Sequence, residues 1–434
     1  MQTIQFEVTN PFGIHARPAA ILAQACVKMP SQITVKCNGK SANGNNVIQL
    51  LGLHAAQGSV LEISAEGGDE ADSLAQIEKI LNDTFAEKKK VDVLKIAFFG
   101  TKDYDRLFFS ELVKDKGEGT FNCDITFFTT RLTPETAYLA KGYSAVCIFV
   151  NDECPEAVVN TLADGGVKLI LLRCMGFNNV DLKAAANRGL TVIRVPAYSP
   201  YAVAEHAMSI IMAANRRLHK AIYRVKDNNF ALNGLMGVDL HNKVAGLIGT
   251  GQIGQCFARI CKGFGMTVIA WDAYPNQKLV DEGLLTYEPT KEAVLEKADL
   301  ISLHVPLFMG PGGTFHIIDA DAISHMKDDA MLVNAGRGAL IDTEALIAAL
   351  KAGKFHAVAL DVYEDEDAYV YTDHSDDFLR HENLARLLMF PNVVVTSHQA
   401  FFTREALQAI AGTTLENARN FNEGNPLGAG ECKA

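Results

Sequence analysis

The sequence predicts an α/β protein in which a small α+β unit precedes two doubly wound parallel sheets. Stretches that alternate apolar and polar residues mark the chain up to residue 86, whereas apolar runs separated by helical segments mark the rest. Half-buried antiparallel strands alternate in this way, and strands buried on both faces of a parallel sheet form apolar runs. The apolar runs begin at residue 94 and begin again at residue 243, which predicts two parallel sheets.

Length, composition and charge exclude several classes of protein. A chain of 434 residues is long enough for several domains, and its 48% hydrophobic and 21% charged residues are ordinary for a globular protein. The net charge of -11 argues against nucleic acid and anionic membranes, since both attract clustered cations. No segment approaches the roughly 20 apolar residues of a membrane span. We therefore expect neither a nucleic acid nor a membrane as a partner.

Cysteine usage and the N-terminal segment indicate the compartment. The nine cysteines are scattered, without a CxxC pair or the spacing of a zinc finger. The segment MQTIQFEVTN lacks the basic start and apolar core of a secretory signal. We expect reduced thiols, no metal site and a cytoplasmic location.

The first part of the chain combines three strands with two amphipathic helices. The strands are expected at TIQFEVT, QITVKCN and SVLEISAEG, and the helices at HARPAAILAQACVKM and DEADSLAQIEKILNDTF. Acidic residues lead the second helix, where they suit the positive N-terminal end of the helix dipole. A short charged joint, AEKKKVDV at residues 86–93, follows this unit. It is too short for a free tether, so we expect the two parts to lie close together.

From residue 94 onward, apolar runs alternate with helical segments as in the βαβ units of a parallel sheet. The first group of runs is LKIAFFGT, SAVCIFV, VKLILLR and LTVIRVP. The second group is KVAGLIG, MTVIAWD, DLISLHV, AMLVNAG, AVALDVY and NVVVTSH. We expect the second group to be inserted within the first, with the last helix packing back on the first sheet.

A glycine-rich turn predicts a dinucleotide site. In GLIGTGQIGQ, three glycines have the G-x-G-x-x-G spacing, directly after a strand-like run and at the start of a helix. They permit a tight turn, a close approach of the backbone to a pyrophosphate, and close packing of helix on strand. Asp272 ends the next strand, where a carboxylate binds ribose hydroxyls and repels the 2′-phosphate of NADP, so we predict NAD. The predicted cofactor-binding residues are Gly249, Thr250, Gly251, Gln252, Ile253, Gly254, Asp272 and Asp361.

Three later strand-like runs are followed by residues that together suit the reduction of a ketone. Arg337 lies in VNAGRGALID, Glu366 in ALDVYEDE and His398 in VVVTSHQAFFT. The carboxyl ends of parallel strands meet at the ligand crevice, so these side chains are expected to face one site. Arginine binds a carboxylate with a planar pair of donors, histidine exchanges a proton with a carbonyl oxygen, and glutamate orients the imidazole.

Residues 94 to about 427 closely resemble the D-isomer-specific 2-hydroxyacid dehydrogenases, and within them the NAD-dependent D-lactate dehydrogenases. The resemblance is carried by RCMGFNNVDL, VPAYSPYAVAEHA, GTGQIG, RGALID, DVYEDE and HQAFFT. It implies that Arg337 binds the substrate carboxylate and polarises the ketone, and that Glu366 pairs with the catalytic His398. The implied reaction is the reduction of pyruvate to D-lactate with NADH.

The same resemblance implies the residues that surround the substrate. Backbone amides of Met175 and Gly176 bind the carboxylate, Tyr198 is the tyrosine of the substrate domain, and Phe149 and Phe401 lie near the methyl end. Bulky aromatic side chains at that end leave little room beyond a methyl group and favour pyruvate over branched 2-keto acids. One departure is the longer Gly/Pro-rich loop at residues 308–314, within HVPLFMGPGGTFHII.

By resemblance the fold consists of two Rossmann-like domains. The catalytic domain comprises residues 94–197 and 400–434, and the NAD-binding domain comprises residues 198–399. Hinge closure between them would exclude water and bring hydride donor and ketone together. Members of the family form dimers or tetramers through their NAD domains, which predicts a homodimer or homotetramer.

His15 stands where the first helix begins, and its residues allow two interpretations. It can be an incidental histidine near a helix cap, or it can carry a phosphoryl group. At a helix N-terminus the first N–H groups are unpaired and the dipole end is positive. A phosphoryl group on His15 would meet these amides and the guanidinium of Arg17, and Pro18 suits the first helical turn.

Residues 1–88 are similar to HPr, the histidine-containing phosphocarrier of the sugar phosphotransferase system, which favours the second interpretation. The likeness covers GIHARPAA, ITVKCNGKSA and QGSVLEISAEGGDE. It implies a small α+β open-faced sandwich, a phosphorylated His15 assisted by Arg17, and phosphotransferase-system proteins as partners. Asn46 stands where many HPr proteins have a regulatory serine, so control by a serine kinase at that site is not expected.

Alternatives remain for each half. The dehydrogenase part could reduce another 2-keto acid, or serve as an NAD(H)-sensing binding protein. The HPr-like part could exchange phosphate, regulate the dehydrogenase when His15 is phosphorylated, or act only as a docking module.

Overall fold

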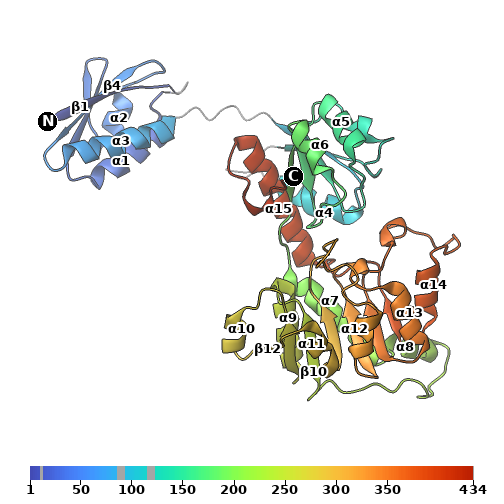
Figure 1. Cartoon of the computed structure of the whole chain (residues 1–434). Helices are drawn as coiled ribbons and strands as arrows, with labels where there is room; N and C mark the ends of the chain where they lie inside the picture. The colour runs from blue at the N-terminus through green and yellow to red at the C-terminus, as the bar shows by residue number, and fades with distance from the viewer. Residues whose placement is uncertain (10–12, 86–92, 115–122, 434) are drawn as a thin grey trace. The chain divides into compact units, whose positions relative to one another are not determined.

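The computed structural model describes residues 1–9, 13–85, 93–114 and 123–433. The chain divides into two compact units, Met1–Asp92 and Val93–Ala434, which are described separately below. The predicted joint falls on residues 86–92, outside the described residues. Figure 1 shows the elements of both units.

The first unit is a four-stranded antiparallel sheet with three helices. Its strand order is β1-β4-β2-β3. The three expected strands and two expected helices are present, together with a short strand and a short helix that the sequence pattern did not indicate (β3 and α2). The bounds are β1 Gln2–Glu7, α1 Ala16–Val27, β2 Gln32–Cys37, β3 Lys40–Asn43, α2 Val47–Gly52, β4 Val60–Glu66 and α3 Glu70–Phe85.

Two polar residues mark the helix starts of this unit. His15 occupies the N-cap position of α1 with an extended backbone (φ −107°, ψ −174°) and is exposed. Asn46 caps α2, since its Oδ1 accepts hydrogen bonds of 3.1 Å from both Ile48 N and Gln49 N. Asn46 therefore has a structural role as the N-cap of α2. The side chain of Arg17 lies outside the described part of the chain.

The second unit contains two parallel sheets. The five-stranded sheet has the order β6-β5-β7-β8-β9, and the seven-stranded sheet has the order β12-β11-β10-β13-β14-β15-β16. Both orders are those of doubly wound sheets, in which the chain starts centrally and winds outward in both directions. The predicted fold class is confirmed.

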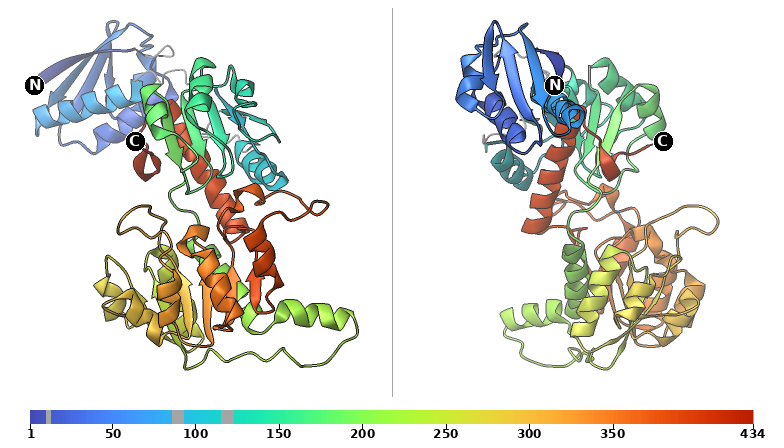
Figure 2. Two further views of the ribbon diagram at one scale, coloured as in Figure 1. Left: turned by 45° about the vertical axis from the view of Figure 1, so that its right-hand side comes forward. Right: turned by 90° about the vertical axis from the view of Figure 1, so that its left-hand side faces the viewer.

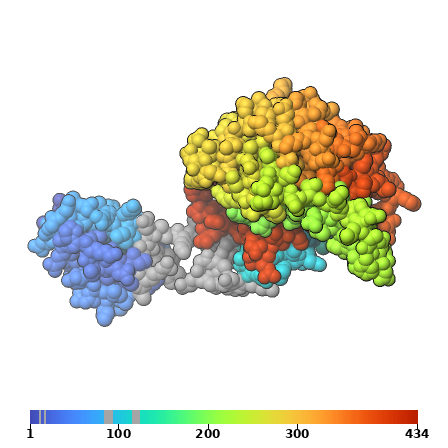
Figure 3. All heavy atoms as spheres, turned by 90° about the horizontal axis from the view of Figure 1, so that it is seen from below, coloured from blue at the N-terminus to red at the C-terminus, as the bar shows by residue number. Residues whose placement is uncertain are grey.

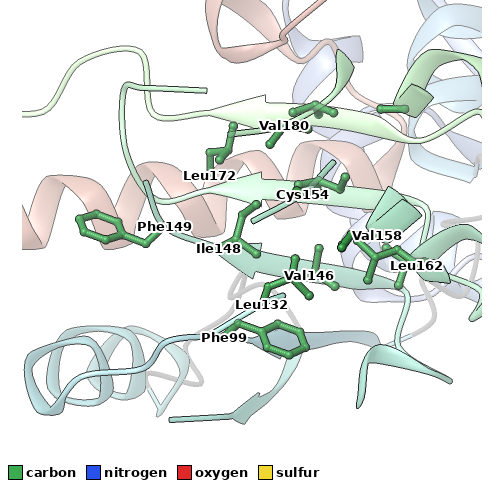
Figure 4. Packing of buried hydrophobic residues seen from close by; sticks show 14 of the residues in the cluster. Phe99, Leu132, Val146, Ile148, Phe149, Cys154, Val158, Leu162, Leu172 and Val180 are labelled. Carbon is green, nitrogen blue, oxygen red and sulfur yellow. The ribbon is translucent and has the colours of Figure 1, made fainter. Parts of the chain in front are cut away.

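The five-stranded sheet is covered by helices on both faces. Its strands are β5 Leu94–Phe98, β6 Cys123–Phe127, β7 Ala145–Ile148, β8 Leu169–Leu172 and β9 Thr191–Arg194. Its helices are α4 Asp103–Lys114, α5 Glu156–Asp164, α6 Leu182–Asn187 and, from the C-terminal end of the chain, α15 Arg404–Glu423. Figure 4 shows the apolar cluster on one face, to which the strands contribute Val146, Ile148 and Leu172 and α5 contributes Val158 and Leu162. Because α15 packs on α4 and β8, the last helix returns to the first sheet as expected.

The seven-stranded sheet is formed by the inserted part of the chain. Its strands are β10 Val244–Ile248, β11 Thr267–Trp271, β12 Thr286–Tyr287, β13 Leu300–Leu303, β14 Ala330–Asn334, β15 Phe355–Leu360 and β16 Val393–Val395. Its helices are α7 Pro200–Asn215, α8 Leu218–Lys226, α9 Gln252–Gly263, α10 Gln277–Asp281, α11 Lys291–Lys297, α12 Ala320–His325, α13 Thr343–Lys351 and α14 Glu382–Met389. Separate apolar clusters fill its two faces, one beneath α7 and α9 and the other beneath α11, α12 and α13.

An arm formed by α8 and residues 227–239 differs from the rest of this unit. None of the residues of α8 is buried. The arm extends from the seven-stranded sheet (Figure 2) and forms a lime-green projection in the space-filling view (Figure 3). Its apolar side chains are largely exposed, and they are Leu218, Ile222, Tyr223, Val225, Phe230, Leu232 and Met236. Such a concentration of exposed apolar groups is typical of an interaction surface.

The lengths of the helices and the state of the cysteines bear on membrane insertion and disulfide formation. In the part of the chain that the structure describes, every helix is too short or too polar to cross a lipid bilayer. All nine cysteines lie in this part, and each is a free thiol.

Candidate active site

The glycine-rich turn connects β10 to α9 and is shaped by close contacts. Gly249 has a φ of +98°, and a Cβ atom there would lie 2.6 Å from the carbonyl oxygen of His304. A Cβ atom on Gly254 would lie 2.4 Å from the carbonyl oxygen of Gly249. Gly251 caps α9, and a Cβ atom there would meet nothing within 4 Å. The first and third glycines are therefore required by packing, whereas the second leaves space at a helix N-terminus for a phosphate group.

Asp272 follows β11 and lies beside this turn. Its Oδ2 accepts hydrogen bonds from Thr250 N (2.6 Å) and Thr250 Oγ1 (2.8 Å), and its Oδ1 accepts one from Tyr274 N (2.9 Å). The hydroxyl groups of Thr250 and Tyr287 are hydrogen-bonded to each other at 2.8 Å. Gln252 and Ile253 form the first turn of α9. A helix N-terminus with open space and a partly buried carboxylate at the end of the next strand fit the pyrophosphate and ribose of NAD.

A histidine that the sequence interpretation did not include lies against the same turn. His304 follows β13, and its ring is 2.9 Å (Nε2 to Oγ) from Ser302 and 5.1 Å (centroid to centroid) from Phe257. Its backbone carbonyl is the group that Gly249 must approach. Burial lowers the pKa of His304 from 6.5 to about 3, so the imidazole is neutral at physiological pH.

His398 and Glu366 form a directly bonded pair. The Nδ1 of His398 is 2.7 Å from Oε1 of Glu366, and both side chains are largely buried. The second carboxylate oxygen of Glu366 accepts a hydrogen bond from Tyr363 N at 3.2 Å. His398 has a φ of +52°, an uncommon conformation for a residue other than glycine. Such outliers persist where the surroundings fix them and are common at functional sites.

The backbone around His398 is held by the buried carboxylate of Asp361. This side chain is completely buried and accepts hydrogen bonds from Thr396 Oγ1 (2.5 Å), Gln399 N (2.9 Å) and Ala400 N (2.8 Å), with His206 Nε2 at 3.1 Å. Burial raises the pKa of this carboxyl group, but the hydrogen bonds from His206, Thr396 and Gln399 outweigh burial and lower the pKa below its ordinary value. Asp361 is thus ionised and fixes residues 396–400.

Arg337 follows β14, and its side chain reaches Gly176, in the segment that follows β8 of the five-stranded sheet. Its Nη1 donates to the carbonyl of Gly336 at 2.8 Å, and a Cβ atom on Gly176 would lie 3.5 Å from its Nη2. Tyr198 lies close enough for its ionisation to respond to this cation, although burial dominates and raises the pKa of Tyr198 to about 12. The structure therefore brings Arg337, Gly176 and Tyr198 together.

Aromatic side chains enclose the space beside His398. The ring of Phe401 is 5.8 Å from that of Phe149, 6.5 Å from that of Tyr198 and 6.2 Å from that of Tyr371. Tyr371 was not indicated by any motif, yet its ring is 6.1 Å from His398 and its hydroxyl donates to the carbonyl of His398 at 2.9 Å. Phe149, Tyr198 and Phe401 come from three distant segments and are gathered by the fold.

A buried ion pair supports Phe149 from within the five-stranded sheet. Arg173 and Asp105 are 3.4 Å apart (Nε to Oδ1), and both side chains are buried. The Cζ of Arg173 lies 5.1 Å from the centroid of the Phe149 ring. Removing either partner would leave an uncompensated buried charge, which is strongly destabilising.

The longer loop at residues 308–314 is held by its own hydrogen bonds. Thr314 Oγ1 donates to the carbonyl of Pro306 at 2.5 Å and accepts from Phe308 N at 2.8 Å. After this loop, His316 Nε2 lies 2.7 Å from Oε1 of Glu364, and His316 N donates to the carbonyl of Ala339 at 2.9 Å. His316 therefore joins the loop to the segments that carry Arg337 and Glu366.

Comparison with known proteins identifies the family. Residues 208–400 match the model of the D-isomer specific 2-hydroxyacid dehydrogenase NAD binding domain. The D-lactate dehydrogenase of Escherichia coli is 44% identical over 332 residues, which are 76% of this chain and 98% of that relative. The chain belongs to the D-isomer-specific 2-hydroxyacid dehydrogenases.

Solved structures agree with this assignment. The pyruvate reductase of Chlamydomonas reinhardtii is 41% identical, with a TM-score of 0.72 over 78% of this chain and 99% of that one. An NAD complex of a D-isomer specific 2-hydroxyacid dehydrogenase from Lactobacillus delbrueckii is 32% identical, with a TM-score of 0.63 over 78% of this chain and 100% of that one. This dehydrogenase is therefore an NAD-binding oxidoreductase.

The N-terminal unit belongs to a different family. Residues 2–83 match the model of the PTS HPr component phosphorylation site. The dehydrogenase thus carries an HPr domain at its N-terminus, as the sequence predicted.

The buried, neutral His304 makes the stability of this dehydrogenase depend on pH. The unfolded chain takes up a proton at this residue below about pH 6.5, whereas the folded chain does so only near pH 3, so stability falls as the pH drops between these values. For this single group the loss is up to about 1.4 kcal/mol per pH unit. We expect the melting temperature of His304→Asn to fall less than that of wild type between pH 7.5 and 5.5, as measured by calorimetry.

The matched control is His325→Asn, which changes a partly exposed histidine of α12 that is paired with Glu296 of α11. This variant removes an imidazole away from the glycine-rich turn, and the pH slope of His304→Asn is compared with it. An unchanged slope in His304→Asn would show that His304 is protonated equally in both states.

Proposed function

We propose that this dehydrogenase reduces pyruvate to D-lactate with NADH, and oxidises D-lactate in reverse. The observation that supports the proposal most directly is the His398–Glu366 pair, 2.7 Å apart, next to an aromatic enclosure and on the same side as Arg337. The relatives named D-lactate dehydrogenase and pyruvate reductase support this choice of substrate.

In the proposed reaction each polar side chain has one task. Arg337 and the backbone amides of Met175 and Gly176 bind the carboxylate of pyruvate, and the guanidinium polarises the ketone. Bound NADH supplies a hydride to the keto carbon. Glu366 holds Nδ1 of His398, which leaves Nε2 to donate a proton to the keto oxygen. The C=O double bond would thereby become a C–O single bond, with a new C–H bond on the carbon and a new O–H bond on the oxygen, and NAD+ and a neutral His398 would remain. The reverse reaction would return the hydride to NAD+ and the proton to His398.

The aromatic enclosure supports pyruvate over larger 2-keto acids. Phe149 and Phe401 are buried, and their ring centroids are 5.8 Å apart. Bulky aromatic side chains at the methyl end of the substrate favour a methyl group over a larger substituent. A dehydrogenase for a larger 2-keto acid is the alternative with the same chemistry. A purely NAD(H)-sensing protein is the second alternative, and the retained pair of His398 and Glu366 is unexpected for it.

The N-terminal unit is proposed to accept a phosphoryl group on His15 from the proteins of the sugar phosphotransferase system. His15 is exposed at the start of α1, and the first N–H groups of that helix lie next to it. The motif match over residues 2–83 supports a carrier, and the covalent fusion supports an effect of this phosphorylation on the dehydrogenase. Arg17 is proposed to assist by contacting the phosphoryl group.

The arm formed by α8 and residues 227–239 is proposed to join two copies of the chain in a homodimer, with a homotetramer as the larger alternative. A stable interface needs about 1,200 Å² of buried surface, and a cluster of exposed apolar side chains on one arm suits this purpose.

The domain division and the location of the chain are proposed as well. The catalytic domain comprises residues 94–197 and 400–434, and the NAD-binding domain comprises residues 198–399. A cytoplasmic location suits the nine free thiols.

The function is tested by turnover. The purified chain should consume NADH with pyruvate and form D-lactate, identified by chiral chromatography. His398→Gln should lower kcat by about 10²- to 10⁴-fold, since general acid catalysis contributes that much, and should still bind NADH. The matched control His325→Gln should keep full activity. If pyruvate is not reduced but phenylpyruvate or hydroxypyruvate is, the alternative substrate class is correct.

The carrier role is tested with enzyme I and labelled phosphoenolpyruvate. Wild type and His54→Ala should each take up one acid-labile phosphoryl group, whereas His15→Ala should take up none. Coupling between sites is usually worth about 5- to 150-fold, so kcat/KM for pyruvate should change at least about fivefold on phosphorylation. Labelling without any kinetic change contradicts the regulatory effect, and no labelling contradicts the carrier role.

The dimer is tested by light scattering. Wild type should have at least twice the mass of one chain, and Phe230→Asp combined with Leu232→Asp should give a single chain, because charges would replace side chains that are 71% and 81% exposed. Phe378→Asp, at a residue 90% exposed outside the arm, is the control and should keep the wild-type mass. A double variant with unchanged mass shows that the arm is not the interface.

A further inference from the structure

In the segment 174–176, which follows β8, each carbonyl group accepts a hydrogen bond from the protein. The carbonyl of Cys174 accepts a hydrogen bond from Val195 N at 3.1 Å, and that of Met175 accepts one from Arg194 Nη1 at 2.8 Å. The carbonyl of Gly176 accepts one from Cys174 Sγ at 3.3 Å. Each peptide unit of this segment is therefore fixed through its oxygen.

Fixing the oxygens also fixes the N–H groups. In a trans peptide unit the C=O and the following N–H point in opposite directions. The N–H of Met175 therefore points away from Val195, and the N–H of Gly176 points away from Arg194. Within the described residues, neither N–H donates a hydrogen bond to the protein. Beside them is a cation, since a Cβ atom on Gly176 would lie 3.5 Å from Nη2 of Arg337.

Arg194 is itself held by several contacts. It is the last residue of β9 and pairs with Leu172 in the register of the five-stranded sheet. Its Cζ lies 5.1 Å from the centroid of the Phe177 ring, a distance at which a cation is attracted to the ring face. Its carbonyl accepts a hydrogen bond from Asn417 Nδ2 of α15 at 3.1 Å. The guanidinium thus spans the segment by binding the oxygen of Met175 and the ring of Phe177.

We propose that Arg194 is a positioning residue for the substrate carboxylate, acting by turning the N–H of Gly176 toward the space in front of Arg337. This inference rests on the proposed function, because that function places the carboxylate at Met175 and Gly176. Arg194 does not touch the substrate. It selects, from the possible orientations of one peptide unit, the orientation that offers a donor to an anion.

A lysine at position 194 would perform the positioning role of Arg194 only in part. An ammonium group can donate to the oxygen of Met175, but it lacks the planar face with which the guanidinium of Arg194 stacks on Phe177. Methionine keeps most of the apolar stem and removes the donor. Arg194→Lys and Arg194→Met therefore separate the hydrogen bond from the packing.

The test measures pyruvate kinetics and the binding of oxamate, a small carboxylate, to the full chain in the presence of NADH. A hydrogen bond that involves a charged group is worth roughly a tenfold change in affinity or more, so Arg194→Met should raise KM for pyruvate and Kd for oxamate about tenfold. KM for NADH should not change. Arg194→Lys should give intermediate values, and it carries the test if Arg194→Met does not fold.

Two comparisons separate positioning from general damage. Arg188→Met is the matched control, because that guanidinium pairs with Asn160 and Asp164 away from this segment, and it should leave all constants unchanged. Methyl pyruvate lacks the carboxylate charge, so its kcat/KM should fall much less than that of pyruvate in Arg194→Met. An equal fall for both substrates, or an unchanged Kd for oxamate, overturns the positioning role.

The proposed function is judged separately from this role. If the wild-type chain binds oxamate but does not reduce pyruvate, the proposed function is contradicted. The effect of Arg194→Met on the Kd for oxamate then decides whether the positioning role is correct. A wild-type chain that reduces pyruvate with constants equal to those of Arg194→Met contradicts the inference alone.

Discussion

The buried carboxylate of Asp361 is the constraint on which the candidate site depends. An ionised group without exposure to water is stable only when its oxygens are hydrogen-bonded, and here the donors come from the segment that carries His398 and from α7. The same bonds that satisfy the charge determine where residues 396–400 lie. The left-handed backbone conformation of His398 is maintained because Thr396 and Gln399, on either side of it, donate hydrogen bonds to Asp361.

The parallel arrangement of the strands places the other polar residues of the candidate site. β14, β15 and β16 end at one edge, so that Arg337, Glu366 and His398 enter the same region although they are far apart in sequence. The aromatic groups Phe149 and Tyr198 arrive from the other sheet of the same unit, and Phe401 follows directly after the segment anchored by Asp361. The residues of the candidate site thus come from two sheets.

The fusion of an HPr domain to this dehydrogenase joins two units that each have a complete core. The first unit buries its own apolar side chains between the sheet and helices, and the second unit buries separate clusters on its two sheets. Each unit therefore has the packing needed for independent stability. A functional connection between them would need two states that differ in their contacts, and phosphorylation of His15 is the change proposed to select between such states.

Much of this protein was determined by its sequence alone. The alternating and continuous apolar patterns predicted both kinds of sheet, because strand burial depends on the side-chain period that a sequence displays directly. The glycine spacing predicted the turn before α9, and the structure shows the reason, since Gly249 and Gly254 have no room for a Cβ atom. The polar residues after β14, β15 and β16 were also recognisable, because they follow apolar runs.

Only the tertiary structure decided which other residues support the site. Tyr371, His206 and Thr396 were not predicted as site residues, and no residue pattern shows that they contact His398 or Asp361. Burial lowers the pKa of His304, and the guanidinium of Arg194, at the end of β9, donates a hydrogen bond to the carbonyl of Met175, which follows β8. The short strand β3 and the capped helix α2 were likewise formed without a periodic signal. These features depend on contacts between residues distant in sequence, and periodicity describes only neighbours along the chain.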